Sequence, residues 1–146
     1  MKQILCVIDF SESAGRVWSV ATGIASACGA HLIVLFPYRL IDYTHEGDIP
    51  SLKRKLETEA KTKFFALKSS NPLTENVACE FHAEIGFMAD RIKAYVKRNT
   101  IDMVVIGQEP TTGAIDTKGF NLQELISSSK LPFIIVPAPV KAEASF

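Results

Sequence analysis

Five short apolar runs, separated by stretches of helical periodicity, constrain the fold of this chain more than any other feature. They span residues 4–8, 31–36, 77–81, 103–106 and 133–137. The runs are rich in β-branched residues and are mostly continuous rather than alternating, which is typical of strands buried on both faces. Because helices cover both faces of parallel sheets, this pattern predicts a buried parallel sheet.

Between the runs, apolar residues recur at the spacing of one helix face. Ser11 or Ser13 is a candidate cap for the first helix, and Gly29 is placed to end it. Asn121 followed by Glu124 forms a candidate cap pair for the last helix. The four apolar stripes are Val17, Val20, Ala21, Ile24 and Cys28; Leu52, Leu56, Ala60, Phe64 and Leu67; Met88, Ile92, Tyr95 and Val96; and Leu122, Leu125 and Ile126. Strict alternation of strand and helix predicts right-handed crossovers and an α/β, doubly wound parallel sheet.

The length of 146 residues suits one domain with one core. We expect this domain to span residues 1–138 and the tail at 139–146 to be frayed. A longer connection at 37–51 contains two prolines and predicts a surface loop, and residues 68–76 predict a turn. No repeat or linker divides the chain.

Charge, hydropathy and cysteine content argue against nucleic-acid-binding, membrane-spanning and secreted proteins. Lysine plus arginine equals aspartate plus glutamate at 16 each, which argues against a dedicated nucleic-acid binder. No apolar run approaches the length that crosses a membrane, and the start lacks the core of a secretion signal. Cys6, Cys28 and Cys79 form no CxxC pair, which favours reduced thiols. We therefore expect a cytoplasmic protein with no nucleic-acid or membrane partner.

Polar residues that follow the strands are the candidates for a site. In open α/β sheets, ligands bind beyond the carboxyl ends of the strands, near the point where strand order reverses. Asp9 ends the first run, where a carboxylate can accept a hydrogen bond from a ligand or can cap the nearby turn. The sequence leaves both roles open. Residues 82–84 follow the third run, where a solvated or capping role for His82 is the simpler interpretation.

Several common doubly wound families do not fit. The stretch after the first run, DFSESAG, holds one glycine instead of GxGxxG, and no stretch fits the Walker A pattern. A phospho-receiver domain would need paired acids after the first strand, and only one acid is well placed. The histidines show no zinc-ligand spacing, and Ser127–Ser129 lack a GxSxG elbow. No catalytic residue and no metal site are predicted.

Three stretches together resemble the universal stress protein family. They are ILCVIDFSESA at the start, GFMADRIKAYVKRNTIDMVVIGQE in the middle, and GFNLQELISSSKLPFIIVP near the end. The resemblance in layout covers nearly the whole chain. It implies a five-stranded sheet of order 3-2-1-4-5 with helices on both faces, similar to adenine nucleotide alpha hydrolases. The implied function is that of a stress-response or regulatory domain.

The loop at 107–121 departs from the pattern of the family's nucleotide-binding members, which carry G-x2-G-x9-G-[S/T]. Gly107 matches the first position, but Pro110 occupies the second. Gly119 matches the third when counted back from the last strand, so the loop is one residue short, and Phe120 replaces the hydroxyl residue. Proline offers no N–H and cannot adopt positive φ. Phenylalanine offers no hydroxyl, so the resemblance implies a degenerate phosphate loop.

Three functional hypotheses follow from the resemblance. The first is a non-catalytic cytoplasmic regulator with weak or absent nucleotide binding and no cofactor. The second is an ATP-binding member with slow hydrolysis, holding ATP with Mg. The third is a binder of another anion or small metabolite, since glycines, Lys118 and a helix N-terminus can rebuild an anion site. The candidate ligand residues are Asp9, Val34, Phe36, Gly107, Gly113, Lys118, Gly119 and Asn121.

The implied strand order places the last run at an edge of the sheet. An exposed apolar edge strand promotes aggregation unless it is covered or paired. Family members that resemble this chain pair this strand with its own copy, so we expect a homodimer. Its interface would contain Phe133, Ile134, Ile135 and Val136, and further protein partners are expected without being named by the sequence.

Overall fold

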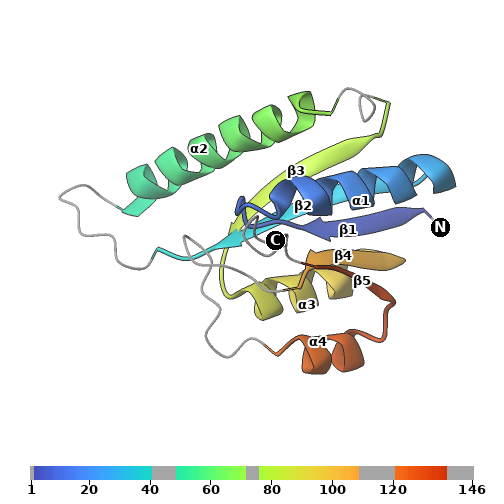
Figure 1. The fold of residues 1–146 in the computed structure, drawn as a ribbon. Coiled ribbons are helices and arrows are strands. Elements are labelled where there is room, and N and C mark those ends of the chain that lie inside the picture. Colours follow the sequence, from blue (N-terminus) through green and yellow to red (C-terminus); the bar gives the residue numbers. More distant parts are fainter. Residues whose placement is uncertain (1, 41–48, 72–75, 109–120, 138–146) are drawn as a thin grey trace, which may run out of the picture.

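The computed structural model describes residues 2–40, 49–71, 76–108 and 121–137, and it contains one five-stranded parallel sheet. The strands lie in the order β3-β2-β1-β4-β5, as expected (Figure 1). Their bounds are Gln3–Val7 for β1, His31–Tyr38 for β2, Cys79–Ile85 for β3, Met103–Gly107 for β4 and Phe133–Val136 for β5. This is the Rossmann-like, doubly wound arrangement predicted from the alternation of strand and helix.

Four helices cover the two faces of the sheet. They are α1 (Ala14–Cys28), α2 (Ile49–Ser69), α3 (Met88–Arg98) and α4 (Leu122–Ser129). Helices α1 and α2 lie on one face, and α3 and α4 lie on the other (Figure 1). This distribution follows from right-handed crossovers, because the chain moves outward from β1 to β3 and then returns to β4 and β5.

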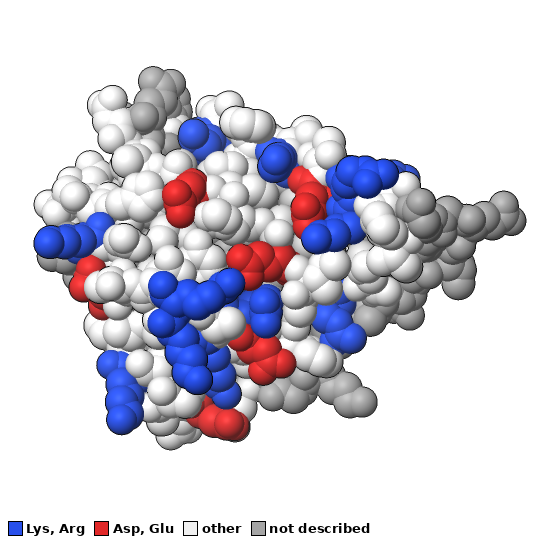
Figure 2. Space-filling view, turned by 180° about the vertical axis from the view of Figure 1, so that it is seen from behind, with Lys and Arg blue, Asp and Glu red and all other residues white. Residues whose placement is uncertain are grey.

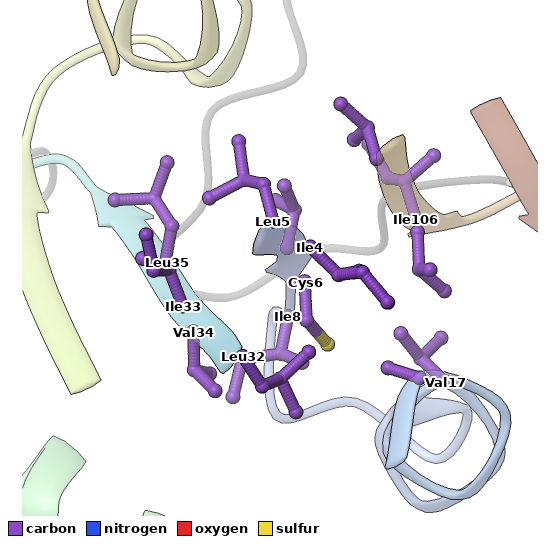
Figure 3. Packing of buried hydrophobic residues seen from close by; sticks show 14 of the residues in the cluster. Ile4, Leu5, Cys6, Ile8, Val17, Leu32, Ile33, Val34, Leu35 and Ile106 are labelled. Carbon is purple, nitrogen blue, oxygen red and sulfur yellow. The ribbon is translucent and has the colours of Figure 1, made fainter. Parts of the chain in front are cut away.

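The core centres on the three inner strands, β1, β2 and β4. Leu5, Cys6, Val34 and Val105 are fully buried. Val17 of α1 points toward β1 and β4 and closes this core from one side (Figure 3). Burial raises the pKa of the Cys6 thiol to about 12, so this cysteine behaves as a small apolar residue.

The edge strands β3 and β5 are less buried than the inner strands. Glu80 on β3 and Ile135 on β5 are exposed. The prediction that every run is buried on both faces therefore holds for the centre of the sheet and is wrong at its edges. Each edge strand pairs with one neighbour only, so its side chains receive cover from fewer directions.

Strand β3 and the end of helix α2 differ from the boundaries that the sequence predicted. Strand β3 begins at Cys79 and continues to Ile85, so residues 82–84 lie inside the strand instead of after it. The reason is its pairing with β2, which itself continues to Tyr38 in register with Ile85. Helix α2 continues to Ser69, so the turn predicted at 68–76 starts later.

Helix ends follow local chemistry at two of the three predicted positions. Gly29 adopts the left-handed conformation at φ 65°, and its N–H donates to the carbonyl oxygen of Ala25. The Asn121 side chain accepts a hydrogen bond from the Glu124 N–H at 3.0 Å, as the predicted cap pair requires. Ser13 occupies the cap position of α1, but its side chain makes no capping hydrogen bond.

A hydrogen bond between side chains joins helix α2 to strand β2, in addition to the apolar contacts of the helix. The Tyr38 hydroxyl donates to Oε2 of Glu57 at 2.6 Å. Burial and the neighbouring Glu57 carboxylate raise the pKa of Tyr38, so the phenol remains protonated and can donate. Phe64 and Trp18 add an edge-to-face contact between α2 and α1, with ring centroids 5.5 Å apart.

The surface loop predicted at 37–51 is shorter than expected, because residues 37–38 belong to β2 and residues 49–51 belong to α2. Residues 41–48 of this loop and the predicted tail at 139–146 lie outside the described residues. Within the described parts of the chain, none of the helices combines the length and apolar character needed to cross a membrane.

Candidate functional site

A narrow cleft opens where β1 and β4 end, beside the start of α1. Its volume is about 10 Å³, which is room for roughly one water molecule. This is the point where the strand order reverses, called the switch point. The chain continues from β1 to β2 on one side, and β4 lies on the other side of β1. The walls consist of Val7, Ile8, Asp9, Ser13, Ala14, Val17, Met88, Ile106 and Gly107.

Asp9 lies at this cleft, and its carboxylate holds the turn into α1. Its Oδ1 accepts a hydrogen bond from the Ser11 N–H at 2.9 Å and another from the Ser11 hydroxyl. The Ser11 hydroxyl also lies 3.0 Å from the hydroxyl of Ser13. Of the two roles that the sequence left open, the turn-forming role is therefore present in the structure.

Gly107 forms the opposite wall, at the end of β4. A Cβ atom at this position would lie 3.6 Å from Cγ2 of Val17 and 3.8 Å from the hydroxyl oxygen of Ser13. These are ordinary contact distances, so Val17 and Ser13 line the space beside Gly107 and a methyl group would fit there. Asp9 and Gly107, which lie far apart in the sequence, thus meet across one small cleft.

Phe10 has an unusual backbone conformation beside the cleft. Its φ is 58°, in the left-handed region that residues other than glycine rarely adopt. Its ring contacts Phe36 edge-to-face, with centroids 4.9 Å apart. The turn between Asp9 and Ser11 and this aromatic contact together fix the conformation, which sequence patterns do not signal for phenylalanine.

Val34 and Phe36, two of the predicted ligand residues, do not line the cleft. Val34 is fully buried in the core. Phe36 faces a separate hollow of about 140 Å³ beneath α2, which Phe10 and Tyr38 also line. Strand β2 continues to Tyr38, so Val34 and Phe36 lie inside the strand and not at its carboxyl end.

The remaining predicted residues belong to the loop before α4. Asn121 is the cap of α4, and its side-chain oxygen is engaged there. Gly113, Lys118 and Gly119 lie outside the described residues, as do Pro110 and Phe120. In contrast, Ser13 and Met88 line the cleft and were not predicted as site residues. The sequence indicated a helix cap for Ser13 and an apolar helix face for Met88, and neither pattern is a sign of a site.

His31 and His82 lie away from the cleft. Nε2 of His82 is 3.1 Å from Oε1 of Glu80, and Nε2 of His31 is 3.8 Å from the other carboxylate oxygen. Within the described residues, no group of three potential metal ligands comes together.

Comparison with known proteins places this geometry in a family. The sequence model of the universal stress protein family matches residues 1–137. No curated protein is significantly similar to this chain in sequence.

Solved structures share the fold at low sequence identity. A universal stress family protein from Burkholderia pseudomallei has a TM-score of 0.68 and 16% identity, with 94% of this chain and 96% of that chain covered. UspA from Lactobacillus plantarum has a TM-score of 0.63 and 20% identity, covering 94% and 97%. A universal stress protein from Archaeoglobus fulgidus, solved in complex with dAMP, has a TM-score of 0.58 and 20% identity, covering 93% and 97%.

The family match over residues 1–137 agrees with the strand order, with the Asp9 turn after β1 and with the glycine that ends β4. The chain therefore belongs to the universal stress protein family.

Proposed function

We propose that this chain is a non-catalytic, cytoplasmic regulatory domain that binds nucleotide weakly or not at all. The observation that carries the proposal is that the cleft beside Asp9 is small and that its carboxylate is already hydrogen-bonded. The Asp9 carboxylate is engaged by Ser11, and the cleft volume of about 10 Å³ is far below the roughly 300 Å³ typical of small-molecule sites. A nucleotide would have to open this cleft and compete for the carboxylate.

The sequence of the adjoining loop supports the same proposal. Backbone N–H groups and a hydroxyl commonly bind phosphates at such loops. Pro110 removes one N–H, and Phe120 replaces the hydroxyl residue of the family pattern. The three cysteines are free thiols, which suits a reducing compartment.

An ATP-binding function is the second candidate, and one observation favours it. Asp9 and Gly107 lie in the same cleft, where a nucleotide would contact the carboxyl ends of the neighbouring strands β1 and β4. The similar protein from Archaeoglobus fulgidus was solved with dAMP. In this alternative, Mg would accompany ATP and slow hydrolysis would follow. A third candidate, binding of another anion or small metabolite, would use Lys118 and the glycines of the loop.

Calorimetry separates these candidates. We expect no heat of binding when ATP and magnesium are titrated into nucleotide-free protein up to millimolar concentration. A dissociation constant near or below about 10 μM, or about −7 kcal/mol, would contradict the proposal. In that case, Asp9→Ala and Gly119→Val should both abolish ATP binding. Inorganic phosphate and cAMP titrated in parallel test the third candidate.

We also propose that regulation involves a homodimer formed through β5. This strand bonds to β4 on one side only, and Ile135 is 39% exposed on it. Pairing two copies of β5 across a two-fold axis would satisfy the free backbone groups and would cover Phe133, Ile134, Ile135 and Val136.

A further inference from the structure

A groove lies between α2 and the outer strand β3, apart from the cleft at Asp9. Its volume is about 310 Å³. It is formed by Lys61, Phe64, Phe65 and Lys68 of α2 and by Cys79 and Phe81 of β3. None of these side chains lines the cleft that contains Asp9. A role for this groove therefore does not depend on nucleotide binding.

The inner surface of the groove is apolar and well packed. Phe64 and Phe81 stack with ring centroids 4.7 Å apart and an angle of 10° between their planes. Cys79 is partly buried, and this burial raises the pKa of its thiol, so it adds no charge. Phe65 stands beside this surface with 62% of its area exposed, the largest exposed fraction among the large apolar side chains in the described residues.

The rim of the groove is cationic. Arg54, Lys61, Phe65 and Lys68 follow one another at intervals of seven, four and three residues, which places them along one stripe of α2. In Figure 2, lysine and arginine side chains are spread along the upper part of the molecule, where α2 lies, with acidic side chains among them. In the described part of the chain, no carboxylate pairs with Lys61 or Lys68.

The charge of α2 contrasts with that of the whole chain. This helix carries Lys53, Arg54, Lys55, Lys61, Lys63 and Lys68 against Glu57 and Glu59, whereas the whole chain has a formal net charge of zero. Surface lysines near an exposed aromatic side chain attract acidic groups and can keep them near an apolar contact. The complementary ligand is therefore acidic around an apolar centre.

A lipid surface fits this helix less well than a protein segment does. A helix that lies in a membrane interface inserts a broad apolar face. Here that face is turned toward the sheet, because Ala60 and Phe64 are buried and Leu56 and Leu67 pack against the core. Two large apolar side chains of α2 remain exposed, Ile49 at the first residue of the helix and Phe65. Of these, only Phe65 lines the concave groove, which suits one inserted anchor residue.

We propose that the groove between α2 and β3 docks a protein segment in which acidic residues flank one large apolar side chain. The apolar anchor packs against Phe65 and Phe81, and the flanking carboxylates lie against Lys61 and Lys68. This contact would give the domain a partner surface on the side of the sheet remote from β5, so that the dimer and the partner can coexist.

Fluorescence anisotropy with defined peptides tests the proposal on the full chain. The probe is a fluorescein-labelled peptide with one central phenylalanine flanked on both sides by glutamates. We expect saturable binding that weakens with added salt. Lys61→Glu with Lys68→Glu should weaken binding by about tenfold or more, and Phe65→Ser should do so as well. In a ¹⁵N-labelled sample, the peptide should shift resonances of residues 61–69 and 79–83.

Matched controls separate this site from general charge attraction. Lys53→Glu with Lys97→Glu makes the same change in net charge at exposed positions outside the groove, and it should leave binding within about twofold. A peptide with serine in place of the central phenylalanine should bind about tenfold more weakly.

Three results would overturn the proposal. One is the absence of binding at millimolar peptide, and another is equal loss of binding in the groove variant and the control variant. The third is sedimentation with vesicles of anionic phospholipid that depends on Lys61 and Lys68 while the peptide does not bind, since that result would assign the surface to a membrane. Unchanged circular dichroism spectra and melting curves would show that the variants are folded.

Discussion

The backbone N–H and the hydroxyl of Ser11 both donate to the same carboxylate oxygen of Asp9. This pair of hydrogen bonds spans Phe10 and holds it at φ 58°. The first loop of the sheet is therefore fixed by its own side chains, without a ligand. The same contacts engage the carboxylate that a nucleotide at this cleft would approach, so a nucleotide would have to compete with them.

Replacement of Phe10 tests whether its backbone conformation is unfavourable. Phe10→Ala and Phe10→Gly both remove the ring, but only glycine adopts positive φ without steric cost. We expect the glycine variant to be more stable than the alanine variant by about 1 kcal/mol in urea unfolding. At Phe36, inside β2, the order should reverse, with glycine less stable than alanine by about 0.5–1 kcal/mol. The same order at both positions would contradict the assigned conformation.

Gly86 also has a positive φ, and here the residue is glycine. Its φ is 148°, and an added Cβ would lie 2.8 Å from Nε of Arg91. Gly86→Ala should therefore lower the free energy of unfolding by about 1–3 kcal/mol. Gly23→Ala is the matched control, because Gly23 lies inside α1 with nothing within 4 Å of the added atom. That change should raise the free energy of unfolding by about 0.5–1 kcal/mol.

Asp102 should make stability depend on pH in the acid range. Its carboxylate accepts hydrogen bonds from the N–H groups of Gln3 and Lys2, both at 2.9 Å, and these bonds hold its pKa below the ordinary value. A carboxyl group with a lowered folded pKa contributes stability above its unfolded pKa of about 3.9. That contribution is lost as the pH falls through the folded pKa.

Thermal melts of the parent and Asp102→Ala proteins can measure this contribution. The parent should melt at the higher temperature at neutral pH, and the difference should shrink steadily below about pH 4. Because the main cause is hydrogen bonding to backbone groups, the difference at neutral pH should persist in molar salt. A difference that stays constant down to about pH 2 would show that ionisation of Asp102 is not involved.

One isoleucine on each edge strand allows a matched test of the proposed dimer. Ile135 on β5 and Ile85 on β3 are each 39% exposed. Ile135→Lys should convert the dimer to a monomer in light scattering at micromolar concentration, because a lysine at a paired edge is costly to bury. Ile85→Lys should leave the dimer intact. A parent protein that is already monomeric would contradict the proposed assembly.

Parts of the site were predictable because they lie at strand ends. Asp9 and Gly107 each follow an apolar run, and the fold brings both to one cleft. Val34 was proposed from its place in the second run, yet it is fully buried. Ser13 and Met88 gave no signal, since their place at the cleft depends on how α1 and α3 pack against the sheet.

The sequence by itself determined the alternation of strand and helix, the left-handed end of α1 at Gly29 and the cap of α4 at Asn121, because each depends on residues close together in the chain. Its resemblance to a family supplied the strand order. Only the tertiary structure decided that β3 extends to Ile85, that Phe10 adopts positive φ and that Phe65 stands beside a groove. The extent of β3 and the setting of Phe65 depend on contacts between distant segments, and the conformation of Phe10 depends on the local Asp9 turn together with the contact to Phe36. Such contacts compete with local preference and in these places outweigh it.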